Sequence, residues 1–359
     1  MTETSKDPLL DLQRSLGADL APWRGVTAAS SYGDPAREAD VLRNACGLFL
    51  HPSDRLSMSG EDRTRFLNGQ VTCEIADRAS GAGTYGFFVT PKGRIEADVT
   101  VLVDDDRLWL DLPPGQGDGI RARLEKYKIV DRVEVEAESI LRLSLMGPGA
   151  EGLLDGVDTP AEPFGHGSGE VDGSPVQVVR ARPLGVTTVD LWVRPEHLGA
   201  VFEALRGRGA EPVGWRALDT VRVEAGVPLW GADFGLEHFP KEIGLEEAIS
   251  YTKGCYLGQE VVARIHYRGG VKKHLRGLRF EGPAPAPGAA VRLDGRKVGE
   301  VGTAAHSEIL GGAFGLAVIH DRAAPGSTVE VGGEAEGPAD SGATRVHAEV
   351  VELPFAPRA

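Results

Sequence analysis

Apolar residues recur at two different spacings along this chain, and each spacing predicts a different element. In residues 94–103 they fall at every second position, which predicts a β-strand with one buried face and with Asp98 on its polar face. Residues 84–90 form a second strand-like run, and Pro91-Lys92-Gly93 separates the two. We therefore expect a β-hairpin that presents Asp98 on one side.

Helical spacing and short apolar runs predict the other elements before residue 280. Asp34 is a candidate N-cap, and Pro35 follows at the first helical position. Helices are expected at 34–45, 62–67, 113–127, 195–206 and 215–224, and strands at 56–59, 107–112, 129–135, 141–145, 176–182 and 187–193. Residues 155–175 are rich in Gly, Pro and acidic residues, so we expect a loop there without chemistry.

The segment 281–290 contains Gly-Pro-Ala-Pro-Ala-Pro-Gly and is expected to be a linker. Short strand-like runs separated by glycine follow it, at 298–301, 314–319 and 328–331. Such runs predict a small all-β module. The mixture of strands and helices before the linker predicts an α+β body.

Composition narrows the class of protein. A chain of 359 residues predicts two or three domains, and a net charge of −14 argues against nucleic-acid binding over the whole surface. The polar start lacks a signal-peptide core, and no apolar run has membrane-spanning length, so we expect a cytoplasmic protein that does not enter a membrane. Cys46, Cys73 and Cys255 are too widely spaced for a disulfide framework or a zinc site, and no metal site is predicted.

The octapeptide 253–260, Lys-Gly-Cys-Tyr-Leu-Gly-Gln-Glu, is the most informative motif. Glycines beside Cys255 let a ligand approach closely, and the Lys253 ammonium would favour the nucleophilic thiolate. Gln259 adds an amide within the same turn. The alternative is an inert, buried cysteine in a glycine-rich turn.

A basic stretch follows the octapeptide in this acidic chain. No Asp or Glu occurs between Val261 and Phe280, and the basic residues there are Arg264, Arg268, Lys272, Lys273, Arg276 and Arg279. This local positive charge is typical of an anion-binding surface. The alternative is a solvated strand or connector.

Residues 253–269 resemble the signature of the YgfZ-type folate-binding proteins, which serve the assembly or repair of iron–sulfur proteins. Residues 222–231, 145–148 and 93–98 are similar to segments of the aminomethyltransferase (T-protein) of the glycine cleavage system. The resemblance extends from about Asp34 to Pro354. It implies an α+β fold of three aminomethyltransferase-like domains around a central hole that binds tetrahydrofolate or a derivative.

The resemblance also implies a division of the chain. Residues 1–50 with 140–240 would form the first domain, 51–139 with 241–275 the second, and 281–359 a C-terminal β-barrel.

Roles for single residues follow from the same resemblance. Asp98 corresponds to an aspartate at the reactive nitrogens of folate, and Arg222 to an arginine near folate that suits its carboxylate tail. The resemblance places Asp190 at the pterin ring, Tyr85 and Trp230 in the pocket wall, Gln259 near the cofactor, and Cys255, Asp98 and Lys253 in the chemistry. The alternatives are a solvent-facing Asp98, an Arg222 paired with Asp219 or Glu224 on a helix surface, and aromatic residues packed in the core.

Two departures from the aminomethyltransferase pattern bear on activity. Arg94 replaces a glycine and Ala97 replaces an aspartate, while the aminomethyltransferase lacks the motif cysteine. The leading hypothesis is therefore a monomeric, tetrahydrofolate-binding accessory protein whose partners are iron–sulfur client or assembly proteins, with Cys255 near the folate pocket. The alternatives are a folate-dependent aminomethyltransferase and a non-catalytic module that binds transfer RNA or a protein through Arg264 to Arg279. The motif does not specify whether a reaction is catalysed.

Overall fold

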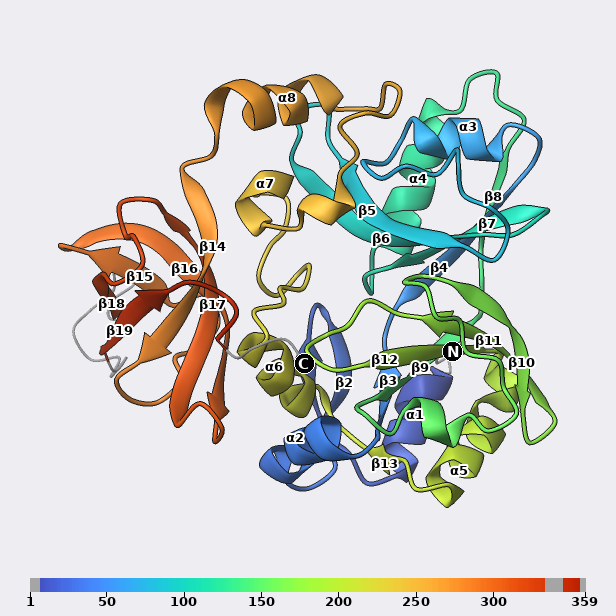
Figure 1. Ribbon diagram of the computed structural model, residues 1–359, viewed down its shortest axis with the longest axis horizontal. Coiled ribbons are helices and arrows are strands. Elements are labelled where there is room, and N and C mark those ends of the chain that lie inside the picture. The colour runs from blue at the N-terminus through green and yellow to red at the C-terminus, as the bar shows by residue number, and fades with distance from the viewer. Residues whose placement is uncertain (1–6, 333–344, 356–359) are drawn as a thin grey trace, which may run out of the picture.

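The computed structural model describes residues 7–332 and 345–355, and Figure 1 shows two β-sheets on one side and a β-barrel on the other. The first sheet has the strand order β10 (His166–Val171), β11 (Ser174–Arg180), β12 (Thr188–Val193), β9 (Leu141–Met146), β3 (Gly47–His51) and β13 (Glu211–Pro212). Helices α1 (Pro8–Ser15) and α5 (Leu198–Gly207) contribute apolar residues to its core.

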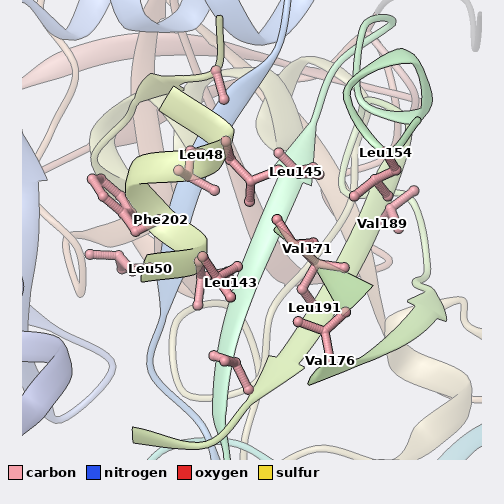
Figure 2. Packing of buried hydrophobic residues seen from close by; sticks show 14 of the residues in the cluster. Leu48, Leu50, Leu143, Leu145, Leu154, Val171, Val176, Val189, Leu191 and Phe202 are labelled. Atoms are coloured by element: carbon pink, nitrogen blue, oxygen red, sulfur yellow. The ribbon is translucent and has the colours of Figure 1, made fainter. Parts of the chain in front are cut away.

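Figure 2 shows how this core is packed, with Phe202 of α5 against leucines of β3 and β9. Leu143 and Leu145 alternate along β9 with Arg142 and Ser144, so charged and polar side chains point to the opposite face of the strand, where Met146 also packs. The first sheet therefore has one apolar face and an opposite face that carries both polar side chains and a second apolar cluster with Phe49 and Met146.

The second sheet has the order β5 (Gly83–Val89), β6 (Ile95–Val103), β7 (Arg107–Leu112), β4 (Asp54–Ser59) and β8 (Glu134–Ala137). Helices α3 (Arg63–Asn68) and α4 (Gly117–Tyr127) share a core with Ala97 and Val99 of β6. Because side chains alternate along a strand, Asp98 points to the other side. The predicted hairpin at 84–103 is confirmed.

The barrel closes in the order β14 (Lys273–Phe280), β17 (Gly312–His320), β16 (Arg296–Ser307), β15 (Ala290–Leu293), β18 (Thr328–Val331) and β19 (Val346–Val351). The prediction of a linker at 281–290 is wrong, because this segment joins two barrel strands, β14 and β15. The barrel begins at Lys273, before the expected start at residue 281. The division of the remaining chain into two discontinuous domains stays a prediction.

The other elements connect these three parts. They are β1 (Asp19–Trp23), β2 (Val26–Ser31), α2 (Pro35–Asn44), α6 (Trp215–Glu224), α7 (Pro240–Ile243), α8 (Gln259–Arg264) and a π-helical turn at Ile265–Gly269. The predicted caps of α2 are confirmed, since Asp34 accepts a hydrogen bond from Ala36 N and Pro35 is the first residue. Figure 1 places α6 between the sheets and the barrel.

Three predicted elements differ from the structure. The strand expected at 129–135 is wrong, because Ile129 and Val130 are 86% and 84% exposed and the strand here is β8. The helix expected from residue 113 begins at Gly117. The expected loop at 155–175 contains strand β10. Within 7–332 and 345–355, no helix is long and apolar enough to span a membrane.

Candidate functional site

A pocket with a cavity volume of about 70 Å³ lies between the two sheets, and we call it the central pocket. Both sheets and the β1–β2 turn contribute polar or aromatic side chains to it. They include Arg24, His51, Tyr85, Asp98, Asp111, Arg142, Phe164, Arg182, Asp190 and Trp192. The polar faces of the alternating strands β6 and β9 thus meet in the middle of the molecule.

Asp98 has one carboxylate oxygen held and one left open. The Tyr85 hydroxyl donates a hydrogen bond of 2.8 Å to Asp98 Oδ2. Oδ1 has no hydrogen-bond partner among the described residues. Burial, and then the neighbouring Asp98, raise the pKa of Tyr85 well above its ordinary value, so its hydroxyl remains a donor at neutral pH. Asp98 can therefore accept a hydrogen bond from a ligand in the pocket.

The other pocket carboxylates are already paired. Arg142 Nε lies 2.9 Å from Asp190 Oδ2, and the Ser144 hydroxyl donates to Asp190 Oδ1 at 2.6 Å. Asp111 accepts from both Arg55 and Arg142. Burial alone would raise the pKa of Asp111, but the two guanidinium groups outweigh it and lower the pKa to about 2.

His51 adds a neutral ring to this charged pocket. Its Nδ1 lies 3.1 Å from the Pro52 carbonyl oxygen. Burial, followed by the charges of Arg142 and Arg24, lowers the pKa of His51 well below its ordinary value. The imidazole is therefore uncharged at neutral pH.

Arg222 does not have the predicted role. Its side chain is fully buried outside the central pocket, and it donates to Asp219 and Asp233, each at 2.6 Å. It also donates to the Val227 carbonyl and to Thr303 of β16. Because these four bonds involve all three of its nitrogen atoms, Arg222 joins α6 to the barrel and has no fork to offer a folate carboxylate.

The predicted aromatic walls have different positions. Tyr85 lines the central pocket, and its ring stacks on Phe164 with centroids 6.3 Å apart and planes at 8°. Trp230 is not among the lining residues, although its carbonyl oxygen accepts a 2.7 Å hydrogen bond from Arg24 Nε. Trp230 thus positions a pocket residue through its backbone.

The octapeptide lies away from the central pocket, since neither Cys255, Lys253 nor Gln259 lines it. Lys253 Nζ donates to the carbonyl oxygens of Val71 and Cys73, and burial lowers its pKa to about 8. Cys255 is exposed. Within the described residues, the Lys253 ammonium thus contacts backbone carbonyls and not the Cys255 thiol, and its effect on the thiolate stays a prediction.

Gly258 explains part of the motif in structural terms. It has φ of 83°, and a Cβ atom there would lie 2.4 Å from the Thr90 carbonyl oxygen. The glycine thus lets the octapeptide pack against the β5–β6 turn before α8 begins at Gln259. Among the described residues, no group of three or more His, Cys, Asp or Glu side chains is placed to hold a metal ion.

The basic stretch extends over α8, the π-helical turn at Ile265–Gly269 and β14. Arg264 lies on α8, whereas Arg276 and Arg279 lie on barrel strand β14. Arg276 is 3.6 Å from Glu352. The six basic residues therefore do not share one helix or one strand.

Sequence reasoning missed Arg24, His51, Asp111, Arg142 and Phe164. A signal existed for Arg142, since it alternates with apolar residues on a predicted strand, as Asp98 does. Phe164 falls in the segment that was expected to be a loop without chemistry. The close approach of the polar faces of two sheets was the missing information.

Comparisons with known proteins agree with this arrangement. The GCVT N-terminal domain family matches residues 9–253, and the glycine cleavage T-protein C-terminal barrel domain family matches residues 273–356. The aminomethyltransferase of Symbiobacterium thermophilum is 30% identical over 356 residues, which cover 92% of this chain and 94% of that protein. A chloroplastic Arabidopsis thaliana protein, named only as a transferase, is 30% identical over 291 residues, or 79% of this chain and 67% of that protein.

A solved structure has the same fold. The aminomethyltransferase T of the glycine cleavage system from Bartonella henselae superposes with a TM-score of 0.86 at 22% identity, covering 98% of both chains. The three-domain aminomethyltransferase-like fold predicted from the sequence is confirmed.

Proposed function

Because this chain belongs to the glycine cleavage T-protein family, we propose that it binds tetrahydrofolate or a derivative in the central pocket and transfers a one-carbon unit there. The observation that carries the proposal is the open Oδ1 of Asp98, in a pocket whose other carboxylates are paired. This carboxylate lines the pocket, and an oxygen without a protein partner can accept a hydrogen bond from a ligand N–H group.

The residues present suit a reduced folate. Asp98 accepts a hydrogen bond from a ring N–H and moves a proton during the reaction, while Tyr85 holds its other oxygen. Bound tetrahydrofolate supplies two nitrogen atoms that take up a one-carbon unit. A groove of about 600 Å³ shares Tyr85 and Phe164 with the central pocket and has room for the rest of the molecule.

Aminomethyl transfer is the reaction that we favour. The bacterial relatives bear the name aminomethyltransferase. The two sequence departures also lie outside the pocket lining, since Ala97 packs in the core of the second sheet and Arg94 covers the Phe239 ring at 3.6 Å. Neither departure therefore alters a residue that lines the pocket.

Calorimetry with tetrahydrofolate under reducing conditions tests the proposal on wild type and Asp98→Asn. The amide keeps the shape but loses the charged acceptor, so we expect binding to weaken by roughly 10-fold or more. Undiminished binding by the variant would remove Asp98 from the site. A wild-type protein that binds no folate form would overturn the proposal.

A glycine-cleavage assay with an S-aminomethyl lipoyl carrier tests the reaction. The methylene carbon leaves the sulfur and the amine and bonds to both folate nitrogens, and their two protons go to the sulfur and to ammonia. We expect ammonia release to fall by roughly 10²–10⁴-fold in Asp98→Asn. A wild-type protein that binds folate but releases no ammonia would exclude this reaction and leave folate binding intact.

We also keep a second candidate, the YgfZ-type accessory function for iron–sulfur proteins. Its specific observation is the exposed Cys255, which the central pocket does not use. A single thiolate cannot hold a stable cluster alone, so client or assembly proteins would supply further ligands.

Complementation of a strain that lacks this protein tests the second candidate. We expect Cys255→Ser to lower the activity of an iron–sulfur enzyme, including one that modifies transfer RNA, and to leave tetrahydrofolate binding unchanged. Cys46→Ser is the control, because that thiol is buried in the first sheet. Full enzyme activity with Cys255→Ser would eliminate the thiol from this function.

A further inference from the structure

We propose that a second cavity, between helices α2 and α6 and barrel strand β16, binds a small organic carboxylate whose charged group is held by Arg24. This cavity has a volume of about 670 Å³. Small-molecule sites commonly have volumes of about 300–1,000 Å³, with apolar walls and a few placed polar groups. The proposal does not rest on folate binding, because most of the lining differs from that of the central pocket.

The walls of the second cavity suit an apolar or aromatic body. Trp23 and Trp215 stack there with ring centroids 6.5 Å apart and planes at 8°. Alanine and proline side chains from α2 and the barrel complete much of the wall, among them Pro35, Ala39 and Ala304. A hydrocarbon or aromatic ring would bury its surface against these groups.

Arg24 supplies the charge. Its side chain lines both the central pocket and the second cavity, so it lies at the boundary between them. Its Nε donates to the Trp230 carbonyl, while its two Nη atoms have no hydrogen-bond or ion-pair partner in the described part of the chain. A guanidinium with both Nη groups free matches the geometry of a carboxylate.

The other charged groups of this cavity are engaged or lie at its rim. Arg43 pairs with Asp40 and with Glu224. Asp219 accepts from Arg222. Arg216 is exposed, so solvent weakens its attraction for an anion. Arg24 is therefore the cation best placed to hold a buried carboxylate.

The backbone at Arg24 supports a functional role. Arg24 and Gly25 form the two-residue turn between β1 and β2, with φ of 51° and 85°. Such a turn favours asparagine or glycine at its first position, and another residue there costs on the order of 1 kcal/mol. The arginine occupies a position that its own backbone preference disfavours, which is typical of functional sites.

Titration of the full chain with 3-phenylpropionate and with the neutral 3-phenylpropionamide tests the proposal. Calorimetry measures affinity, and tryptophan fluorescence reports on Trp23 and Trp215. We expect wild type to bind the carboxylate roughly 10-fold or more tightly than the amide, because charge-assisted hydrogen bonds to Arg24 form only with the acid.

Arg24→Asn suits the turn but lacks the guanidinium, so we expect this variant to bind the two probes equally. Arg24→Lys retains the charge without the fork and should keep part of the preference. Arg216→Gln is the matched control and should keep the wild-type ratio. Equal affinities in wild type, no binding of either probe, or an unchanged preference in Arg24→Asn would each overturn the proposal. Tetrahydrofolate titrations of the same proteins report separately on the central pocket.

Discussion

Arg222 is fully buried and Arg24 is half-buried, and these two arginines have opposite surroundings. Arg222 donates to two aspartates, a carbonyl and a hydroxyl, and it joins α6 to the barrel. Among the described residues, Arg24 has a partner for Nε alone, and its side chain lines both cavities. Donors without a protein partner therefore separate an arginine that is available to a ligand from a structural one of the same residue type.

The carboxylates of the central pocket follow the same division. Asp111 and Asp190 are held by arginines, and Ser144 completes the shell of Asp190. Asp98 has one oxygen held by Tyr85 and the other open. The paired carboxylates hold the pocket together, whereas Asp98 is available to bind a ligand and to take part in a reaction.

We expect the largest loss of stability from a substitution of Arg222. Arg222→Met leaves Asp219 and Asp233 buried without their cation, so we expect the free energy of unfolding to fall by about 3–5 kcal/mol. Urea unfolding at neutral pH measures this. In the double variant with Asp233→Asn, part of the loss should return. A fall of less than about 1 kcal/mol for Arg222→Met would show that Arg222 is no more important for stability than Arg24.

The next largest effect is the loss of stability in acid, when Asp111 becomes protonated. Its pKa is lowered to about 2 in the folded protein, below that of an unfolded aspartate, so it stabilises the fold above pH 4. This contribution, about 2 kcal/mol, is lost as the pH falls from 4 to 2. Wild type should therefore lose more stability than Asp111→Asn over this range in urea unfolding. If the free energy of unfolding fell equally with pH in the two proteins, the ionisation of Asp111 would not be coupled to folding.

The smallest effect on stability is expected at Arg24. Arg24→Asn removes the hydrogen bond to the Trp230 carbonyl but relieves the turn, and each change is worth about 1 kcal/mol with opposite sign. The free energy of unfolding should therefore change by less than about 1 kcal/mol. A loss as large as that of Arg222→Met would make Arg24 a structural residue.

Local patterns predicted the elements that carry Asp98, because alternation along residues 94–103 defines both faces of β6. The position of Arg222 on a helix was also predictable. The hydrogen-bond partners of its guanidinium were not predictable, since Thr303 comes from the barrel, 81 residues away. Ile129 and Val130 misled the prediction, because an apolar pair in a connection can stay exposed.

The role of the octapeptide could be predicted only in part. Its motif residues resemble a family, but the spacing cannot tell that Lys253 turns inward to two backbone carbonyls while Cys255 stays at the surface. Pocket residues such as Arg24 and Phe164 come from segments far apart in the chain, so their meeting depends on the packing of the two sheets.

The proline-rich segment after β14 has a practical consequence for dissecting the molecule. A truncation designed there would look like a cut between domains, yet it would leave β14 attached to the body and remove the other five strands of the barrel. The backbone edges of β14 would then lack their neighbouring strands and could pair with a second chain, which would cause aggregation. A clean excision must instead cut before Lys273, in the turn that follows Gly269.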